Sequence, residues 1–199
     1  GIVMRTPMID LFNRMHLVKP EHFNQARIFT VTGIDNRNIR NAAEAVVRHH
    51  DMLRAVYRNG ELEVLPVRES RLYDFYEFDY SEKTDAEKAV LEKCTEIQSS
   101  IDIEKGPIIK IVVFDLGKEK VMMICIHQLV VDSVSWSIIA NDFNTVLQQL
   151  EYSSDIKLPD KTASFKIWSN EIHVKAENES DKFEITKINE EMQKYCNLR

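Results

Sequence analysis

The sequence of 199 residues has few of the features that mark disulfide-rich, metal-binding or disordered proteins. Its three cysteines, Cys94, Cys125 and Cys196, are odd in number and widely separated. They form no CxxC pair, so the pattern predicts neither a disulfide framework nor a cysteine-based metal site. Reduced thiols in a cytoplasmic protein are the simplest interpretation. With only five glycines and five prolines, no long stretch has the composition of a disordered segment.

The charge and the hydrophobic content of the chain exclude further classes of protein. The formal net charge is −6 and no concentrated basic face is visible, so we expect no nucleic-acid partner and no anionic membrane partner. No apolar run approaches the length of a membrane span. The hydrophobic content of 44% is enough for a buried core, and the length fits one compact domain or one large lobe of something bigger.

Helical and strand-like patterns alternate along the chain, which predicts a mixed α/β layer structure. Helices are expected over residues 6–15, 36–53, 84–101, 132–150 and 182–198, with another beginning within 164–170, and strands over 29–31, 55–57, 62–65, 75–78, 108–114 and 121–126. Asp35 is the expected N-cap of the second helix, and Thr84 with Glu87 predicts a capping box for the third. Leu91 and Ile138 are among the side chains expected to face inward. Residues 175–181 are polar and predict a flexible break.

Two pairs of strands are expected to form hairpins. Asn59-Gly60 separates the first pair, and both residues tolerate the positive φ of a tight turn. The second pair, 108–114 and 121–126, is linked by a short segment that contains Gly117. These two strands are apolar almost throughout, which is typical of strands covered on both faces. Cys125 lies in the second of them and is interpreted as core filler, since buried thiols are usually inert.

The segment with the most chemical information is residues 125–136. A buried strand ends at His127-Gln128, and Asp132 opens a helix four residues later. Polar side chains at the exit of a buried strand favour a site in a cleft. The spacing alone is equally consistent with a plain helix start, in which Asp132 is the N-cap, Ser135 lies in the first turn and Trp136 anchors the core.

Residues 127–136, His-Gln-x-x-x-Asp-Ser-Val-Ser-Trp, resemble the HHxxxDGxSW signature of condensation and epimerization domains of nonribosomal peptide synthetases, in the chloramphenicol-acetyltransferase-like superfamily. Other segments resemble motifs of this family in the family's order: residues 6–12 its opening TPIQxWF motif, 22–26 an HxNQ segment that favours the epimerization branch, 48–54 the RHxxLR helix end, and 106–110 the GPLLR strand start. The resemblance runs from about residue 4 to residue 170 and covers the N-terminal lobe only.

The resemblance implies a fold and a set of partners. The expected fold is a chloramphenicol-acetyltransferase-like two-layer sandwich, a mixed sheet with helices packed on it, present as a single lobe. Residues 1–170 would form the N-terminal lobe, and residues 171–199 a helical extension toward an absent second lobe. In this family, carrier proteins deliver phosphopantetheine-linked substrates to a tunnel between two lobes. The expected partners are therefore a peptidyl carrier protein or neighbouring synthetase domains, with a second lobe or another copy of the chain supplying the other wall. No cofactor is expected to bind directly.

Departures from the signature predict a loss of activity. The family's second His is its acid/base or positioning residue, and here Gln128 holds that place without a useful protonation equilibrium. His127 matches the first, mainly structural His, and adjacent residues on a strand point to opposite faces. Ser133 replaces a Gly where the family's backbone approaches the substrate. The candidate catalytic set is therefore His127, Gln128, Asp132 and Ser133.

Further roles follow from the resemblance. The family's signature Asp bonds the Arg that ends the RHxxLR helix, which predicts a buried ion pair between Asp132 and Arg54. Ser135 and Trp136 are the candidate substrate-binding residues.

The histidines that precede Arg54 are not expected to bind metal. His50 lies on the apolar stripe of its helix, which favours a place at the core edge, and His49 is expected to be solvated. No metal ligand is expected anywhere in the chain.

Three functions remain open at this point. The first is a condensation/epimerization lobe that is non-catalytic as it stands and acts on or docks with carrier-bound aminoacyl or peptidyl groups. The second is an active lobe that belongs to a larger two-lobed enzyme. The third, a coenzyme A-dependent acyltransferase, fits less well, because such enzymes carry the His motif near the C-terminus and here 63 residues follow Trp136.

Overall fold

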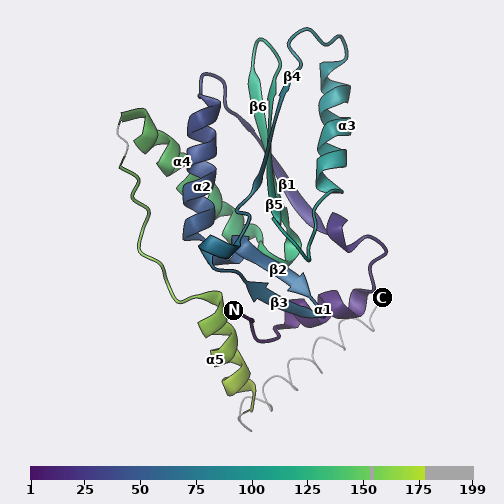
Figure 1. Cartoon of the computed structure of the whole chain (residues 1–199), viewed down its shortest axis with the longest axis vertical. Helices are drawn as coiled ribbons and strands as arrows, with labels where there is room; N and C mark the ends of the chain where they lie inside the picture. The colour runs from purple at the N-terminus through teal and green to yellow at the C-terminus, as the bar shows by residue number, and fades with distance from the viewer. Residues whose placement is uncertain (153–154, 178–199) are drawn as a thin grey trace, which may run out of the picture.

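The computed structural model describes residues 1–152 and 155–177 (Figure 1). Its helices are α1 (Pro7–Met15), α2 (Asn36–His49), α3 (Ala86–Gln98), α4 (Ser133–Tyr152) and α5 (Phe165–Glu177). Its strands are β1 (Asn24–Thr30), β2 (Ala55–Arg58), β3 (Glu61–Val64), β4 (Asp74–Asp79), β5 (Ile109–Asp115) and β6 (Lys120–His127). Among the described residues, no helix combines the length and the apolar character needed to cross a membrane.

A four-stranded sheet in the order β1-β6-β5-β4 forms the centre of the fold. β6 pairs antiparallel with both β1 and β5, whereas β4 runs parallel to β5, so the sheet is mixed as expected. β2 and β3 form a separate antiparallel hairpin. The turn between them is Asn59-Gly60 with φ of 52° and 81°, which confirms the predicted tight turn.

Helices pack on both faces of the sheet (Figure 1). α2 and α4 cover one face, where side chains such as Val46 and Phe143 meet Ile111 of β5. α1 and α3 contribute to the core on the other face, which receives Val112 of the same strand. Because successive strand residues point to opposite faces, β5 must be apolar at nearly every position. This arrangement explains the continuous apolar run and confirms the prediction of strands covered on both sides.

Buried Cys125 is a core residue, as predicted. It is 0% exposed, and burial raises the pKa of its thiol to about 12. A thiol in this state stays protonated at neutral pH and is a poor nucleophile. Cys94 is likewise free and buried, and Cys196 lies outside the described residues.

Three local predictions about the helices were wrong. α3 begins at Ala86 with no side-chain cap, so Thr84 and Glu87 form no capping box. Leu91 is 69% exposed and Ile138 is 49% exposed, although both were expected to face inward. Both are exposed for the same reason. Neighbouring helix residues are turned by about 100° around the axis, so two adjacent apolar residues do not both face the core. Val90, which is partly buried, and Ile139, which is buried, face the core as expected.

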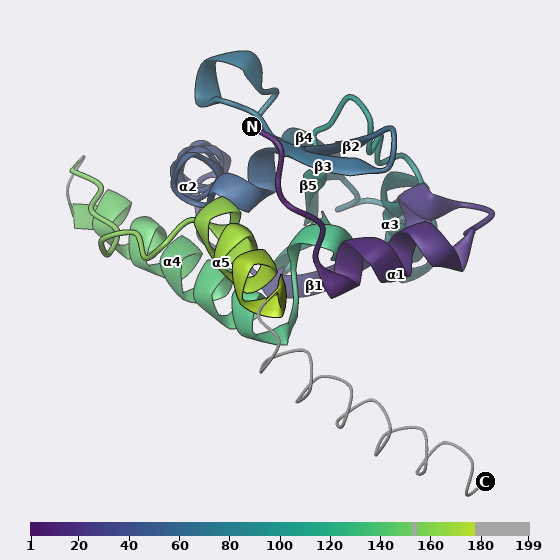
Figure 2. The ribbon, with the colours of Figure 1, turned by 90° about the horizontal axis from the view of Figure 1, so that it is seen from below.

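The C-terminal part of the described chain is α5, which confirms the helix expected to begin within residues 164–170. α5 continues to Glu177, across the boundary expected at residue 170 and into the segment expected to be a break. Figures 1 and 2 place it beside the N-terminal segment. The helix expected over 182–198 lies outside the described residues.

Candidate functional site at the end of strand β6

The turn from β6 into α4 has the form that the sequence predicted. β6 ends at His127, a single 3-10 turn spans Gln128–Val130, and α4 starts at Ser133. The carboxylate of Asp132 accepts a hydrogen bond of 2.7 Å from the backbone N–H of Ser135 and thereby caps the helix. This hydrogen bond holds the pKa of the Asp132 carboxyl below its ordinary value.

His127 is fixed in the core with both ring nitrogens occupied. The residue is 1% exposed, and its ring makes edge contacts with Phe12 and Phe23. The backbone N–H of Leu129 donates to Nδ1 at 3.3 Å, so Nε2 must carry the proton that is donated to the carbonyl of Pro20 at 2.9 Å. Burial holds the pKa of this imidazole below its ordinary value. His127 is therefore a neutral structural residue with no free lone pair for a substrate proton.

Gln128 leaves the strand just beyond this buried ring. The residue is half-buried, and its backbone N–H donates to the carbonyl of Phe23 at 2.9 Å. Its side-chain amide makes no hydrogen bond to any part of the chain that the structure describes. An open groove of about 470 Å³ lies next to Phe23, and its lining comprises Leu17, Lys19, His22, Phe23, Thr95 and Ser99. Gln128 itself does not line this groove.

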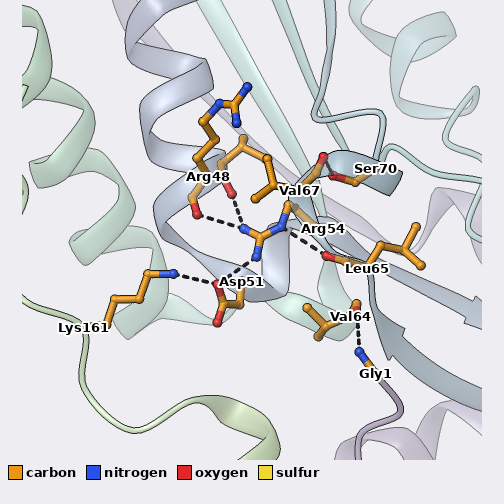
Figure 3. A network of polar contacts seen from close by, with 10 residues as sticks. Gly1, Arg48, Asp51, Arg54, Val64, Leu65, Val67, Ser70 and Lys161 are labelled. Atoms are coloured by element: carbon orange, nitrogen blue, oxygen red, sulfur yellow. Dashed lines mark hydrogen bonds and ion pairs between the residues drawn. The ribbon is translucent and has the colours of Figure 1, made fainter.

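The predicted ion pair between Asp132 and Arg54 is absent from the described residues. Arg54 instead donates to Asp51 at 2.8 Å and to the carbonyls of Val47 and Arg48 at 2.7 and 3.0 Å (Figure 3). The last carbonyls of a helix lack partners within the helix, and those at the end of α2 bind the guanidinium that follows them. Asp132 is exposed and serves only its own helix start.

The remaining candidate residues divide between surface and core. Ser133 is exposed at the first position of α4, and Ser135 is half-buried in the first turn. Trp136 is 1% exposed, and its indole N–H donates to the side-chain oxygen of Gln25 at 2.8 Å. The guanidinium of Arg27 lies 5.4 Å from the centre of the ring. Trp136 is thus the core anchor of the plainer interpretation, and its ring is not accessible to a substrate.

Two residues of the HxNQ segment have structural roles that the sequence did not reveal. Asn24 on β1 donates to the carbonyls of Glu21 and Gln98 at 3.1 and 2.9 Å, and Gln25 holds Trp136. Gln25 and Trp136 are 111 positions apart in the chain. The motif identified the segment in the sequence. The hydrogen-bond partners of Asn24 and Gln25 are known only from the way the folded chain packs around β1.

Removing the Asp132 carboxylate is expected to have a small effect. Because Asp132 is a helix cap and not half of a buried ion pair, Asp132→Ala should lower the free energy of unfolding by about 1 kcal/mol, as lost caps typically do. Asp132→Asn keeps the hydrogen-bond acceptor, so its free energy of unfolding should be close to that of the native protein. Urea unfolding measures both variants. A loss above about 3 kcal/mol for Asp132→Ala would instead indicate an unpaired buried charge.

Acidification is expected to destabilise the fold through His127. Its pKa is lowered in the folded state, so the unfolded chain binds the proton more readily, and stability falls as pH drops through the unfolded value of about 6.5. His49, whose pKa is lowered chiefly by burial, acts in the same direction. His127→Asn should therefore be less stable than the native chain at pH 7.5. Between pH 7.5 and pH 5.5, however, its free energy of unfolding should fall by less than that of the native chain. If the urea midpoints of the variant and of the native chain fell equally over this pH range, His127 would not be the source of the acid sensitivity.

Comparisons with known proteins agree with these features. The model of the family described as Condensation domain matches residues 11–184. Over 183 residues the chain is 32% identical to gramicidin S synthase 1 of Brevibacillus brevis, covering 90% of this chain and 17% of the synthase. It is 33% identical over 183 residues to tyrocidine synthase 2 of Brevibacillus parabrevis, covering 90% of this chain and 5% of the synthase. The chain thus spans a small part of these relatives.

Solved structures give the same picture. The epimerization domain from the third module of tyrocidine synthetase B superposes with a TM-score of 0.87 at 32% identity, covering 90% of this chain and 42% of that chain. The starter condensation domain of rhizomide synthetase superposes with a TM-score of 0.72 at 13% identity, covering 89% of this chain and 44% of that chain, and this likeness supports the fold alone. The expected chloramphenicol-acetyltransferase-like fold, present as a single lobe, is confirmed. With a family model matching most of its length, the chain belongs to the condensation-domain family.

Proposed function

We propose that this chain is the N-terminal lobe of a condensation/epimerization domain of nonribosomal peptide synthesis, and that it docks with carrier-bound aminoacyl or peptidyl groups without turning them over. One observation carries the proposal. His127 has both ring nitrogens in hydrogen bonds to the backbone, and the next residue, at the family's acid/base position, is Gln128.

The chemistry of these two side chains supports the absence of turnover. Removing a proton from the α-carbon of an aminoacyl group, or from an attacking amine, requires a lone pair whose conjugate acid has a pKa near neutrality. The amide of Gln128 has no such lone pair. The lone pair on Nδ1 of His127 already accepts the backbone N–H of Leu129. General acid/base catalysis commonly contributes about 10²–10⁴-fold in rate, so its loss is enough to silence the site.

The match to an epimerization domain indicates which partners a complete site would need. The chain corresponds to 42% of the epimerization domain on which it superposes, so the rest of a two-lobed site would come from a second lobe or from another copy of the chain. The phosphopantetheine arm would arrive on a peptidyl carrier protein, and neighbouring synthetase domains are the other expected partners. The free thiols of Cys94 and Cys125 fit the reducing cytoplasm in which we place the protein.

Carrier binding tests the docking role. The full 199-residue chain should bind an aminoacyl carrier protein that bears the phosphopantetheine arm, measured by isothermal titration calorimetry, and bind the same carrier without the arm more weakly. Equal affinity for both forms would show that the arm is not recognised. No binding to either form would refute the docking role.

Isotope exchange tests the absence of turnover. The chain is mixed with an aminoacyl carrier protein in D₂O, and deuterium at the α-carbon is followed by mass spectrometry. We expect incorporation at the rate of the carrier protein alone. Incorporation above that rate would show that a proton is being removed and would refute the non-catalytic assignment, while leaving the docking result to stand independently.

An active lobe of a larger two-lobed enzyme is the second candidate. The TM-score of 0.87 with less than half of an epimerization domain favours it. Exchange in a protein that contains both lobes, with Gln128 unchanged, would support this candidate. Exchange that appears only with Gln128→His would show that the missing imidazole is what prevents turnover.

A further inference from the structure

Three potential metal ligands meet where the C-terminal end of α2 packs on the middle of α4. Nε2–H of His50 donates to Oδ2 of Asp142 at 2.7 Å, and the ring of His49 lies at 4.9 Å from that of His50, centre to centre. One ligand atom from each of the three residues lies within 4.8 Å of the other two. Spacing in the sequence predicted no metal site, because His50 and Asp142 are 92 positions apart.

The surroundings of these residues differ from those of solvated surface histidines. His49 was expected to be solvated but is half-buried. Asp142 is 8% exposed. A neutral imidazole offers a lone pair to a metal ion, and a nearly buried carboxylate supplies negative charge with little competition from water.

We propose that His49, His50 and Asp142 bind one Zn²⁺ ion, with the fourth coordination position open to water. Two imidazoles and one carboxylate are the donor set that zinc accepts in tetrahedral sites. Ligand atoms around such an ion lie about 3.3 Å apart, since each bond is about 2.0 Å. His50 and Asp142 must separate slightly and His49 must move closer, which side-chain rotation provides. The proton between His50 and Asp142 leaves to solvent as the ion takes its place.

The site is separate from the end of β6. Asp142 follows Asp132 by ten residues on the same helix, a distance of about 15 Å at the rise of an α-helix. The ion would join the end of α2 to α4, two helices of one core that contact each other through their apolar faces. Its direct consequence is stabilisation of this pair, because a ligand that binds only the folded state raises the melting temperature.

A neighbouring lysine limits the affinity of the site. The ammonium of Lys161 pairs at 2.8 Å with Asp51, which follows His49 and His50 directly in the chain (Figure 3). An ammonium group repels a bound cation across a short distance. The arrangement therefore predicts that Lys161 weakens zinc binding although it is not a ligand.

Titration of the full chain tests the site. After treatment with a chelator, the chain is titrated with Zn²⁺ by calorimetry and with Co²⁺ by visible absorption, which reports tetrahedral coordination. We expect one ion per chain and a rise in melting temperature that EDTA reverses. His49→Ala should weaken binding by more than about tenfold, the scale on which a supporting residue alone acts. The side chain of His49 makes no hydrogen bond within the described residues, so this variant should fold even if His50→Ala does not.

Two further variants complete the test. His22→Ala, which removes an exposed histidine outside the cluster, should leave the titration unchanged. Lys161→Gln should tighten binding severalfold. The proposal is overturned if native chain and His49→Ala bind zinc equally, if neither binds it, or if Lys161→Gln weakens binding.

Discussion

Arg54→Ala should lower the free energy of unfolding by about 3 kcal/mol, because the buried guanidinium donates hydrogen bonds to several groups at the end of α2. The Arg54 side chain is 6% exposed and also donates to the carbonyl of Leu65 at 3.2 Å, which joins α2 to the segment after β3. Its loss leaves the carbonyls of Val47 and Leu65 without this donor, while Asp51 keeps Lys161. Natural domains are stable by about 5–15 kcal/mol, so a large share would be lost.

A matched arginine serves as the control for this prediction. Arg48 pairs with Glu44 on the exposed side of α2, with half of its side chain accessible, so Arg48→Ala should cost at most about 0.5 kcal/mol. Arg54→Lys should fall between the two, since an ammonium keeps the charge but cannot reproduce the planar set of donors. Urea unfolding at pH 7.5 gives all three values. Equal losses for Arg54→Ala and Arg48→Ala would show that the buried network contributes little.

His127→Ala should be comparably destabilising, by about 3 kcal/mol, for a different reason. The substitution leaves a cavity between Phe12 and Phe23 and removes the partners of the Pro20 carbonyl and the Leu129 amide. Thermal or urea unfolding measures the loss. A catalytic His127 would give a different result, because a residue selected for chemistry can be replaced with little effect on stability.

Gln128→Ala is the control for His127→Ala. Gln128 is the adjacent residue, but its side chain is half-buried and makes no hydrogen bond in the described part of the chain, so the loss should stay within about 0.5 kcal/mol. If Gln128→Ala were the more destabilising of the two, the assignment of His127 as the structural residue would be wrong.

Several features that depend on neighbours in the sequence were predicted correctly, although the capping box expected for α3 was not. The stripe of α2 with its Asp35 cap, the Asn59-Gly60 turn and the doubly covered strands β5 and β6 all follow from residues a few positions apart. The turn from His127 into α4 was predicted in the same way. The helical period alone did not separate Leu91 or Ile138 from their buried neighbours, because a turn of about 100° is within the width of an apolar stripe.

What the sequence settled was the order of the elements and the presence of an amide side chain, Gln128, directly after β6. Only tertiary structure decided which polar groups meet: Arg54 with the carbonyl of Leu65 and not with Asp132, Trp136 with Gln25, and His50 with Asp142. The physical reason is that a polar side chain satisfies its hydrogen bonds with the groups that packing brings to it, and packing joins segments far apart in the chain.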